Sequence, residues 1–112
     1  MIKIYHNPRC QKSRTALAYV EERDENIEVV EYLKNPPTAK ELKEVLQLLK
    51  MKPMDIIRKK ETLYIDSYKD KEFTDAQWIS ILAEHPVLIE RPILINKNKA
   101  VIARDEATLK SF

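Results

Sequence analysis

The stretch "IKIYHNPRCQKSRTALAYV", residues 2–20, decides the fold of this chain. Residues 2–5 alternate between apolar and polar side chains, which predicts a short strand that ends at the Asn7-Pro8 turn. From Gln11 to about Arg23 the pattern becomes helical, with one face formed by Ser13, Ala16, Leu17 and Val20. A strand, a turn and a helix in immediate succession place Cys10 at the start of that helix.

The middle of the chain predicts a second strand and a helical block. β-branched residues in 26–33 indicate the strand, and prolines at 36 and 37 stop it. Thr38 and Glu41 form a capping-box signature for a helix, whose apolar stripe is Leu42, Val45, Leu46 and Leu49. A shorter helical piece begins at Pro53 and runs toward Arg58, and residues 61–73 are predicted to form an ordered loop.

The last third predicts another helix, a β-hairpin and a closing helix. Thr74 and Gln77 form a second capping box, and Pro86 ends the helix that follows. Residues 91–95 and 100–103 predict two strands around an asparagine-containing turn, and Asp105 is expected to cap a final helix. The whole order predicts an α/β fold, a small mixed sheet covered by helices, in a single domain over residues 1–112.

Composition narrows the classes of function. The chain has 112 residues, of which 44% are hydrophobic and 34% charged, and a net charge of +2, which is too small to indicate nucleic-acid binding. No apolar run is long enough to cross a membrane and the N-terminus lacks a secretory pattern, so a cytoplasmic location is expected. The chain contains no glycine, which excludes P-loop and Rossmann nucleotide sites. With one cysteine, neither an internal disulfide nor a cysteine-based metal site is expected.

Cys10 has the surroundings of a reactive thiol. The unpaired N–H groups and the positive end of the helix dipole favour the thiolate, and Arg9, Lys12 and Arg14 act in the same direction if their side chains turn inward. The alternative is a buried structural cysteine, which would be expected in an apolar run rather than in a polar loop. Ser13 could donate a hydrogen bond to the thiolate or be simply a small helix residue, and His6 could act as acid or base or be an ordinary residue before a turn.

These residues carry a resemblance to a known family. Residues 5–17, "YHNPRCQKSRTAL", are similar to the active-site segment of the glutaredoxin-linked arsenate reductases, whose motif is His-Asn-Pro-x-Cys-Gly-Thr-Ser-Arg. The similarity continues through "YLKNPPT" (32–38), "IIRKKE" (56–61) and "FTDAQWISILAEHPVLIERPI" (73–93). It implies a thioredoxin-like fold with a four-stranded mixed sheet, flanking helices and a helical insertion at about residues 38–88.

The resemblance also implies roles for particular residues. Arg58, Arg91 and Arg104 match positions that hold the arsenate oxyanion, and the planar guanidinium fork suits a tetrahedral anion. Pro92 matches the family's cis-proline. The implied activity is arsenate reduction for arsenic detoxification: the Cys10 thiolate attacks arsenic, glutathione acts as co-substrate, and glutaredoxin clears the mixed disulfide. No bound cofactor is expected.

The chain departs from the family's pattern at two places, one directly after Cys10 and one directly before Arg91. Gln11 and Lys12 stand where the motif has Gly-Thr, and Glu90 places a carboxylate directly before Arg91. Both departures bear on whether arsenate is the substrate. Two other functions share the fold: a regulator similar to Spx that binds RNA polymerase, and a thiol oxidoreductase or sensor without arsenate activity. The regulators carry a Cys-x-x-Cys pair, whose second position here is Ser13, which favours the enzyme.

Overall fold

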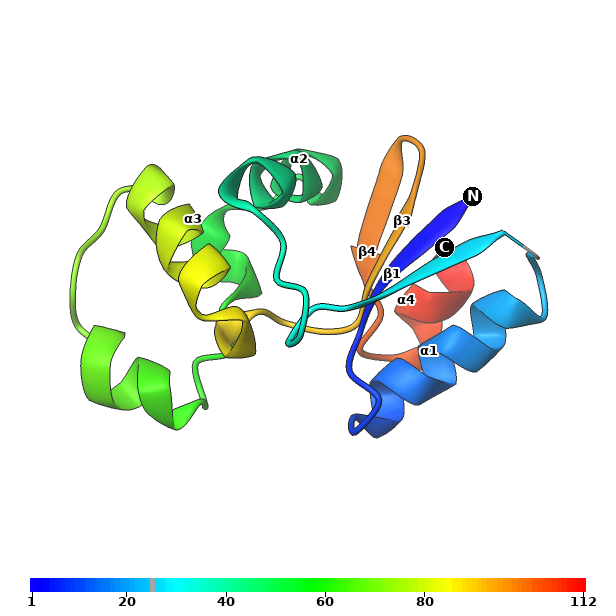
Figure 1. Cartoon of the computed structure of the whole chain (residues 1–112), viewed down its shortest axis with the longest axis horizontal. Helices are drawn as coiled ribbons and strands as arrows, with labels where there is room; N and C mark the ends of the chain where they lie inside the picture. The colour runs from blue at the N-terminus through cyan, green and yellow to red at the C-terminus, as the bar shows by residue number, and fades with distance from the viewer. Residues whose placement is uncertain (25) are drawn as a thin grey trace. The chain divides into compact units, whose positions relative to one another are not determined.

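The computed structural model describes residues 1–24 and 26–112 (Figure 1). The chain divides into two compact units, one formed by residues 1–35 and 91–112 and the other by residues 36–90. The prediction of a single domain with an insertion at about 38–88 stays a prediction, and each unit is described by itself below. No helix in the described ranges is long and apolar enough to cross a membrane.

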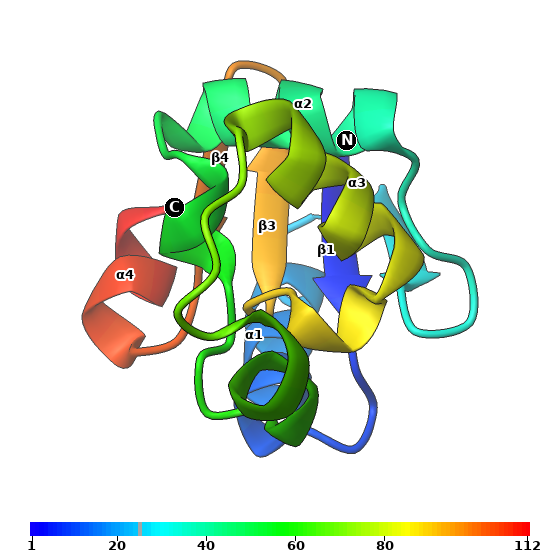
Figure 2. The same ribbon diagram turned by 90° about the vertical axis from the view of Figure 1, so that its left-hand side faces the viewer.

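The first unit is built on a four-stranded mixed sheet in the order β2-β1-β3-β4. Its strands are β1 (Ile2–His6), β2 (Ile27–Glu31), β3 (Ile93–Asn96) and β4 (Lys99–Ile102). β1 pairs in parallel with β2 and antiparallel with β3, and β3 pairs antiparallel with β4, as Figure 2 shows for the neighbouring β1 and β3. The residue pattern predicts such a small mixed sheet, and this is the topology of the thioredoxin-like fold that the family resemblance implies.

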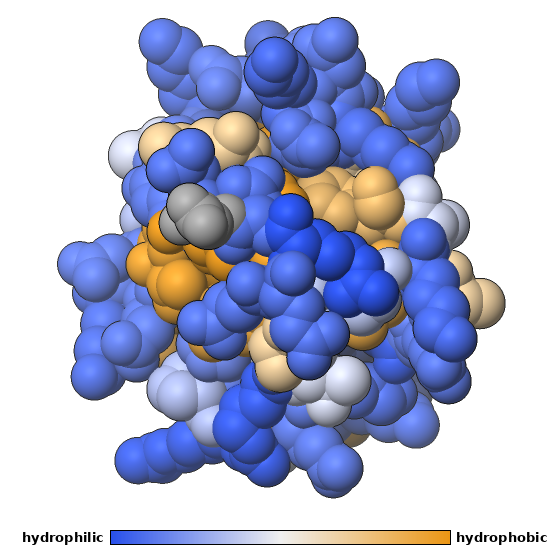
Figure 3. All heavy atoms as spheres, turned by 90° about the vertical axis from the view of Figure 1, so that its right-hand side faces the viewer, coloured by the Kyte–Doolittle hydropathy of each residue, from blue (hydrophilic) through white to orange (hydrophobic). Residues whose placement is uncertain are grey.

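Helices α1 (Gln11–Glu21) and α4 (Glu106–Ser111) cover one face of this sheet (Figure 1). The core beneath them joins apolar residues from both helices and from the sheet, namely Ile2, Ile4, Ala16, Val20, Leu94, Ala103 and Leu109. Ser13 is buried at the α1 face with Ala16 and Val20, as the helical pattern predicts. Outside, the side of the molecule in Figure 3 is mainly hydrophilic, with an apolar patch among the polar side chains.

The second unit is helical. It contains α2 (Ala39–Leu49), η1 (Pro53–Ile56), η2 (Tyr64–Tyr68), α3 (Asp75–Glu84) and η3 (Pro86–Leu88). Both predicted capping boxes are present, since Thr38 and Thr74 each exchange two hydrogen bonds with the residue three positions later. The predicted α2 stripe of Leu42, Val45, Leu46 and Leu49 is buried. Aromatic rings pack around Trp78, with Phe73 edge-on at 4.9 Å between ring centroids.

One element differs from the sequence prediction. The sequence predicts an ordered loop over residues 61–73, but Tyr64–Tyr68 form a turn of π-helix that Lys69 ends by donating its N–H to Tyr64 O. Tyr64 is buried and stacks near Trp78, with 6.4 Å between the ring centroids. The expectation was wrong because aromatic packing, rather than an apolar stripe, stabilises this turn.

Turns that glycine usually makes are made by other residues. Lys50, Asp70 and Lys97 adopt positive φ angles of 58°, 66° and 42°. Lys97 lies in the turn of the β3–β4 hairpin, where the sequence predicts a turn without glycine. Residues with a Cβ pay an energetic cost in this left-handed region, so these positions are places where the chain accepts local strain.

Candidate active site

Strand pairing brings three loops of the first unit to one edge of the sheet. Tyr5 near the end of β1 pairs with Ile93 at the start of β3, and Ile93 pairs with Ile102 at the end of β4. Beyond the strands, Ala103 donates its N–H to Pro92 O at 2.9 Å. The Cys10 loop, the Arg91-Pro92 segment and the β4–α4 connection therefore meet at this edge.

Asn7 shapes the loop that carries Cys10. Its side-chain Oδ1 accepts a hydrogen bond from Arg9 N–H at 3.0 Å, and its carbonyl accepts one from Cys10 N–H at 3.0 Å. Its own N–H donates to Ser13 Oγ at 3.0 Å. From the sequence, Asn7 is only part of an Asn-Pro turn, and the Asx-turn chemistry of asparagine is the signal that accounts for these contacts.

Ser13 and His6 form a buried polar pair under the loop. His6 Nδ1 and Ser13 Oγ lie 2.6 Å apart and share a hydrogen bond whose donor depends on the imidazole tautomer. Ser13 is 0% exposed and His6 is 6% exposed. Burial lowers the pKa of His6, the charge of Arg14 lowers it further, and the opposing effect of Glu31 does not cancel the shift. His6 is therefore predominantly neutral at pH 7, in contact with Ser13 rather than exposed to solvent.

Cys10 is partly buried at the start of α1. Burial by itself raises the pKa of its thiol, but the backbone N–H of Ser13, the charge and side-chain hydrogen bond of Arg91, and the backbone N–H of Lys12 together lower it below the ordinary thiol value. The sulfur makes no side-chain cap hydrogen bond, so these N–H groups act as favourable dipoles near the sulfur rather than as full bonds. The net effect favours the thiolate.

Ser13 acts on the Cys10 thiol through its backbone rather than through the hydroxyl that the sequence suggests. The hydroxyl was considered as a donor to the thiolate, but it is hydrogen-bonded to His6 and to Asn7 N–H. The group of Ser13 that lowers the pKa of Cys10 is its backbone N–H. A side-chain substitution at Ser13 can therefore leave this effect in place.

The sequence predicts that the loop cations favour the thiolate only if their side chains turn inward. Arg9, Lys12 and Arg14 are exposed, and the guanidinium of Arg14 donates to Pro8 O at 2.9 Å. The cation with the largest effect on the pKa of Cys10 is Arg91, which comes from a distant part of the sequence. Local sequence could not reveal this, because the β1–β3 pairing is what brings Arg91 to the loop.

Arg91 has an unused donor. Its Nε is buried and has no hydrogen-bond partner among the described residues. A buried donor without a partner costs free energy, about 1–3 kcal/mol for a typical group, unless a ligand or water satisfies it. The guanidinium of Arg91 lies close enough to Cys10 to lower the pKa of its thiol, and its planar fork of donors suits an oxyanion beside the sulfur. The following Arg91–Pro92 peptide bond is cis, and Pro92 is fully buried.

The other two arginines occupy different settings. Arg104 is exposed and follows Ala103 at the loop edge just described. The pKa of the neighbouring Asp105 is lowered, first by Thr108 and further by the charges of Arg104 and Lys12, so these cations lie near the start of α4. Arg58 belongs to the second unit, where its Nη1 lies 2.8 Å from Glu61 Oε2. The role of Arg58 in oxyanion binding stays a prediction. Its ion pair with Glu61 is not predicted by the sequence analysis.

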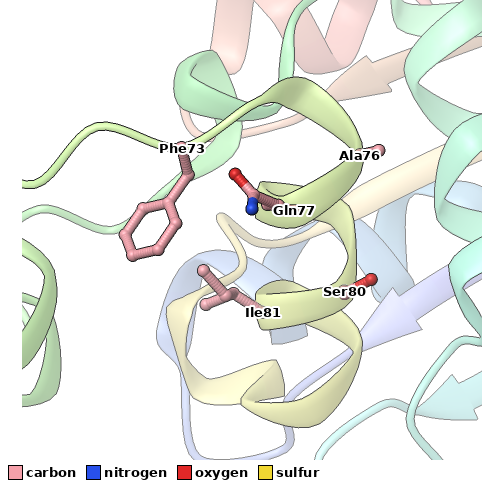
Figure 4. Close-up of a pocket in the computed structure, with 5 residues that line it drawn as sticks. All are labelled: Phe73, Ala76, Gln77, Ser80 and Ile81. Carbon is pink, nitrogen blue, oxygen red and sulfur yellow. The ribbon is translucent and has the colours of Figure 1, made fainter.

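A pocket of about 370 Å³ lies elsewhere, on the second unit. Phe73, Ala76, Gln77, Ser80 and Ile81 line it, from α3 and the residues before it (Figure 4). The side chain of Gln77 accepts the Thr74 N–H of the helix cap at 2.8 Å. None of the residues predicted for the site lines this pocket. Across residues 1–24 and 26–112, no group of His, Cys, Asp and Glu side chains could hold a metal ion.

Comparisons with known proteins agree with this arrangement. A family model described as the ArsC family matches residues 5–112. The chain belongs to the ArsC family. It is 42% identical over 105 residues to the arsenate reductase of Neisseria meningitidis serogroup A, covering 92% of this chain and 90% of that protein. It is 39% identical over 105 residues to the uncharacterized protein YfgD of Escherichia coli K12, covering 92% and 88%.

A solved structure supports the same family and fold. The arsenate reductase from Vibrio cholerae is 37% identical and superposes with a TM-score of 0.90, covering 99% of this chain and 97% of that one. The family and the thioredoxin-like fold predicted from the sequence are therefore confirmed.

Within this ArsC-family chain, the motif positions Gln11 and Lys12 lie in the first turn of α1 and are both exposed.

Proposed function

We propose that this chain is an arsenate reductase-type thiol oxidoreductase whose nucleophile is Cys10. The observation that carries the proposal is the pairing of a thiol of lowered pKa with Arg91, whose buried Nε has no partner among the described residues. A thiolate supplies the nucleophile and the adjacent guanidinium of Arg91 supplies the anion-binding donors. Membership in the ArsC family, with relatives named arsenate reductase, supports arsenate as the oxyanion.

The first step is attack of the Cys10 thiolate on arsenic(V) in arsenate. A sulfur–arsenic bond forms, an arsenic–oxygen bond breaks, and the leaving oxygen takes up protons to depart as water. No electrons are transferred at this stage, so arsenic stays pentavalent in the thiol-arsenate adduct. Arg91 offsets the charge of the oxyanion beside the sulfur, and Arg104 stands near the same edge of the sheet.

The second step requires an external thiol, for which we propose glutathione. Its thiolate attacks the Cys10 sulfur, a disulfide bond forms, and the sulfur–arsenic bond breaks with its electron pair passing to arsenic. Arsenite, now trivalent, leaves after protonation, and the two sulfurs are oxidised to a mixed disulfide. Because Cys10 is the only cysteine in the chain, a second external thiol, proposed to be that of glutaredoxin, must reduce this disulfide.

His6 and Ser13 act as positioning residues in this scheme. Their hydrogen bond and the Asn7 N–H contact hold the loop so that the Ser13 and Lys12 N–H groups face the sulfur. The roles of Arg58 and Pro92 rest on the family resemblance. Ser13 itself weighs against a Cys-x-x-Cys regulator, because its hydroxyl is buried in hydrogen bonds where that class has its second thiol.

The test is arsenite release from arsenate with glutathione and glutaredoxin present. We expect turnover by the wild-type chain and none by Cys10→Ser. A matched control combines Cys10→Ser with Ser80→Cys, which moves the single thiol to an exposed position on α3 and is expected to remain inactive. Arsenite release that persists in Cys10→Ser, or is absent from the folded wild type, contradicts the proposal.

The proposed binding of the oxyanion at Arg91 has a separate test. Arsenate or sulfate bound at Arg91 should protect Cys10 from alkylation, and Arg91→Gln should lose this protection. Arg23→Gln removes the same charge past the far end of α1 and should keep it. Equal protection in the wild type and Arg91→Gln would place the anion elsewhere.

A further inference from the structure

The loop between β1 and α1 contains a tight turn that Asn7 closes from one side (Figure 1). Asn7 O accepts the N–H of Cys10 at 3.0 Å, the hydrogen bond that defines a β-turn from Asn7 to Cys10. Within this turn, Asn7 Oδ1 accepts the N–H of Arg9 at 3.0 Å. Pro8 occupies the second position, where its fixed φ angle suits the turn and its missing N–H is not needed. These contacts leave the carbonyl of Pro8 to another partner.

Arg14 holds the other side of the same turn. Its Nη1 donates to Pro8 O at 2.9 Å, and its backbone N–H donates to Cys10 O at 3.0 Å. The backbone contact would form with any residue except proline at this position. The contact with Pro8 O, in contrast, requires a long side chain that ends in a donor. It is therefore the interaction that is specific to arginine at position 14.

The dipole of α1 does not favour a cation near its start. The N–H groups at a helix N-terminus carry partial positive charge and attract acids. Helices α2, α3 and α4 follow this rule, since each has an acid in its first turn, namely Glu41, Asp75 and Glu106. The first turn of α1 has no acid, and Arg14 is its fourth residue. The bond to the loop, rather than the helix dipole, accounts for an arginine at this place.

The turn that Arg14 holds carries the sulfur to the start of the helix. Cys10 is the N-cap residue of α1, with an extended backbone at φ −98° and ψ 122°. The N–H groups of Ser13 and Lys12, which lower the pKa of the thiol, belong to the helix itself. Their effect on a charge falls off within a single turn. A shift of the turn backbone therefore moves the sulfur relative to the groups that stabilise the thiolate.

We propose that Arg14 is a positioning residue of the candidate active site, which holds the turn through Pro8 O and thereby keeps the Cys10 sulfur beside the helix N–H groups. The proposal rests on the proposed function in taking Cys10 as the nucleophile. One hydrogen bond of this kind changes an equilibrium by about two- to tenfold. Its loss should shift the loop by that factor toward conformations in which the thiolate is less stabilised.

The experiment measures the rate of Cys10 alkylation by iodoacetamide, a neutral reagent, against pH in the full chain. Arg14→Met keeps an unbranched apolar stem and removes the donor and the charge, whereas Arg14→Lys keeps a charge and a donor. Arg23→Met is the matched control, because Arg23 Nη1 donates to Tyr19 O at 3.0 Å near the other end of α1. Arg9→Met controls for charge, since the Arg9 side chain is exposed and has no hydrogen bond or ion pair within residues 1–24 and 26–112.

We expect Arg14→Met to raise the apparent pKa of the thiol, so that alkylation below that pKa becomes about two- to tenfold slower than in the wild type. This difference should be the same at about 0.1 M and about 1 M salt, because salt screens surface charges but does not remove a hydrogen bond. Arg14→Lys should recover part of the rate. Arg9→Met should have a smaller effect that disappears at about 1 M salt, and Arg23→Met should leave the profile unchanged.

Three results would overturn the proposal. The first is an unchanged pH profile in Arg14→Met. The second is an equal effect of Arg14→Met and Arg9→Met at both salt concentrations, which would indicate charge alone. The third is an equal change in Arg14→Met and Arg23→Met, with equal losses of stability in urea, which would indicate general destabilisation of α1. The assay contains no arsenate, so a failure of arsenite release in the turnover assay contradicts the proposed function and leaves this measurement interpretable.

Discussion

Replacement of Ser13 by alanine separates two roles that this residue combines. The hydroxyl satisfies His6 Nδ1 at 2.6 Å and the Asn7 N–H at 3.0 Å, whereas the backbone N–H lowers the pKa of Cys10. The substitution removes the first role and keeps the second. We therefore expect Ser13→Ala to destabilise the fold while the Cys10 thiol keeps its lowered pKa.

The expected loss of unfolding free energy in Ser13→Ala follows from the polar groups that it leaves without hydrogen-bond partners. His6 is buried, and an unsatisfied buried polar group costs about 1–3 kcal/mol. The Asn7 N–H is only partly buried, so its loss adds about 1 kcal/mol. Alanine recovers a few tenths of a kcal/mol through its helix propensity, and the net loss of unfolding free energy is about 2–3 kcal/mol.

Two measurements on the same variant check this reasoning. Urea unfolding gives the change in free energy, and the pH dependence of iodoacetamide alkylation gives the apparent pKa of Cys10. Ser80→Ala, an exposed position on α3, is the control and should change the unfolding free energy by less than about 0.5 kcal/mol. A thiol pKa that returns to its ordinary value in Ser13→Ala would refute the assignment, because it would make the hydroxyl the group that stabilises the thiolate.

Three further predictions concern pH, helix capping and the core. The pKa of His6 is lowered on folding, so the unfolded chain binds more protons than the folded chain at acid pH. The unfolding free energy should therefore fall as the pH drops below about 6.5. The His6→Asn variant should show a weaker dependence on pH. Thr38→Ala removes the side-chain acceptor of the α2 capping box and should cost about 1 kcal/mol in urea unfolding. Leu94→Ala empties a position that is 0% exposed in the sheet core and should cost about 2–5 kcal/mol by the same measurement.

Each of the three has a matched control. His85→Asn changes the other histidine, which is only half-buried, and should keep the acid dependence. Thr15→Ala alters an exposed threonine within α1 and should have little effect, and Val29→Ala truncates an apolar residue that is 45% exposed. Equal losses in a variant and its control would show that the named contact is not the cause.

Much of the local structure could be predicted from the sequence. The alternation at residues 2–5, the helical pattern after Cys10 and the two capping boxes each depend on residues within a few positions of one another. The π-helical turn at Tyr64–Tyr68 could not, because its stability comes from aromatic rings that meet only in the folded unit. The family resemblance supplied Arg91 as a site residue, but the local pattern around it carries no such signal.

The sequence by itself determined that Cys10 is the only thiol and that it begins a helix whose first turn carries cations. The first fact is a matter of composition, and the second follows from neighbours in the chain, since helix dipoles and capping act over a single turn. Tertiary structure alone decided which groups act on the sulfur. Strand pairing brings Arg91 to Cys10, and burial directs the Ser13 hydroxyl to His6 while Arg9, Lys12 and Arg14 stay exposed. The direction of a side chain depends on what the rest of the fold packs against it, which no local pattern specifies.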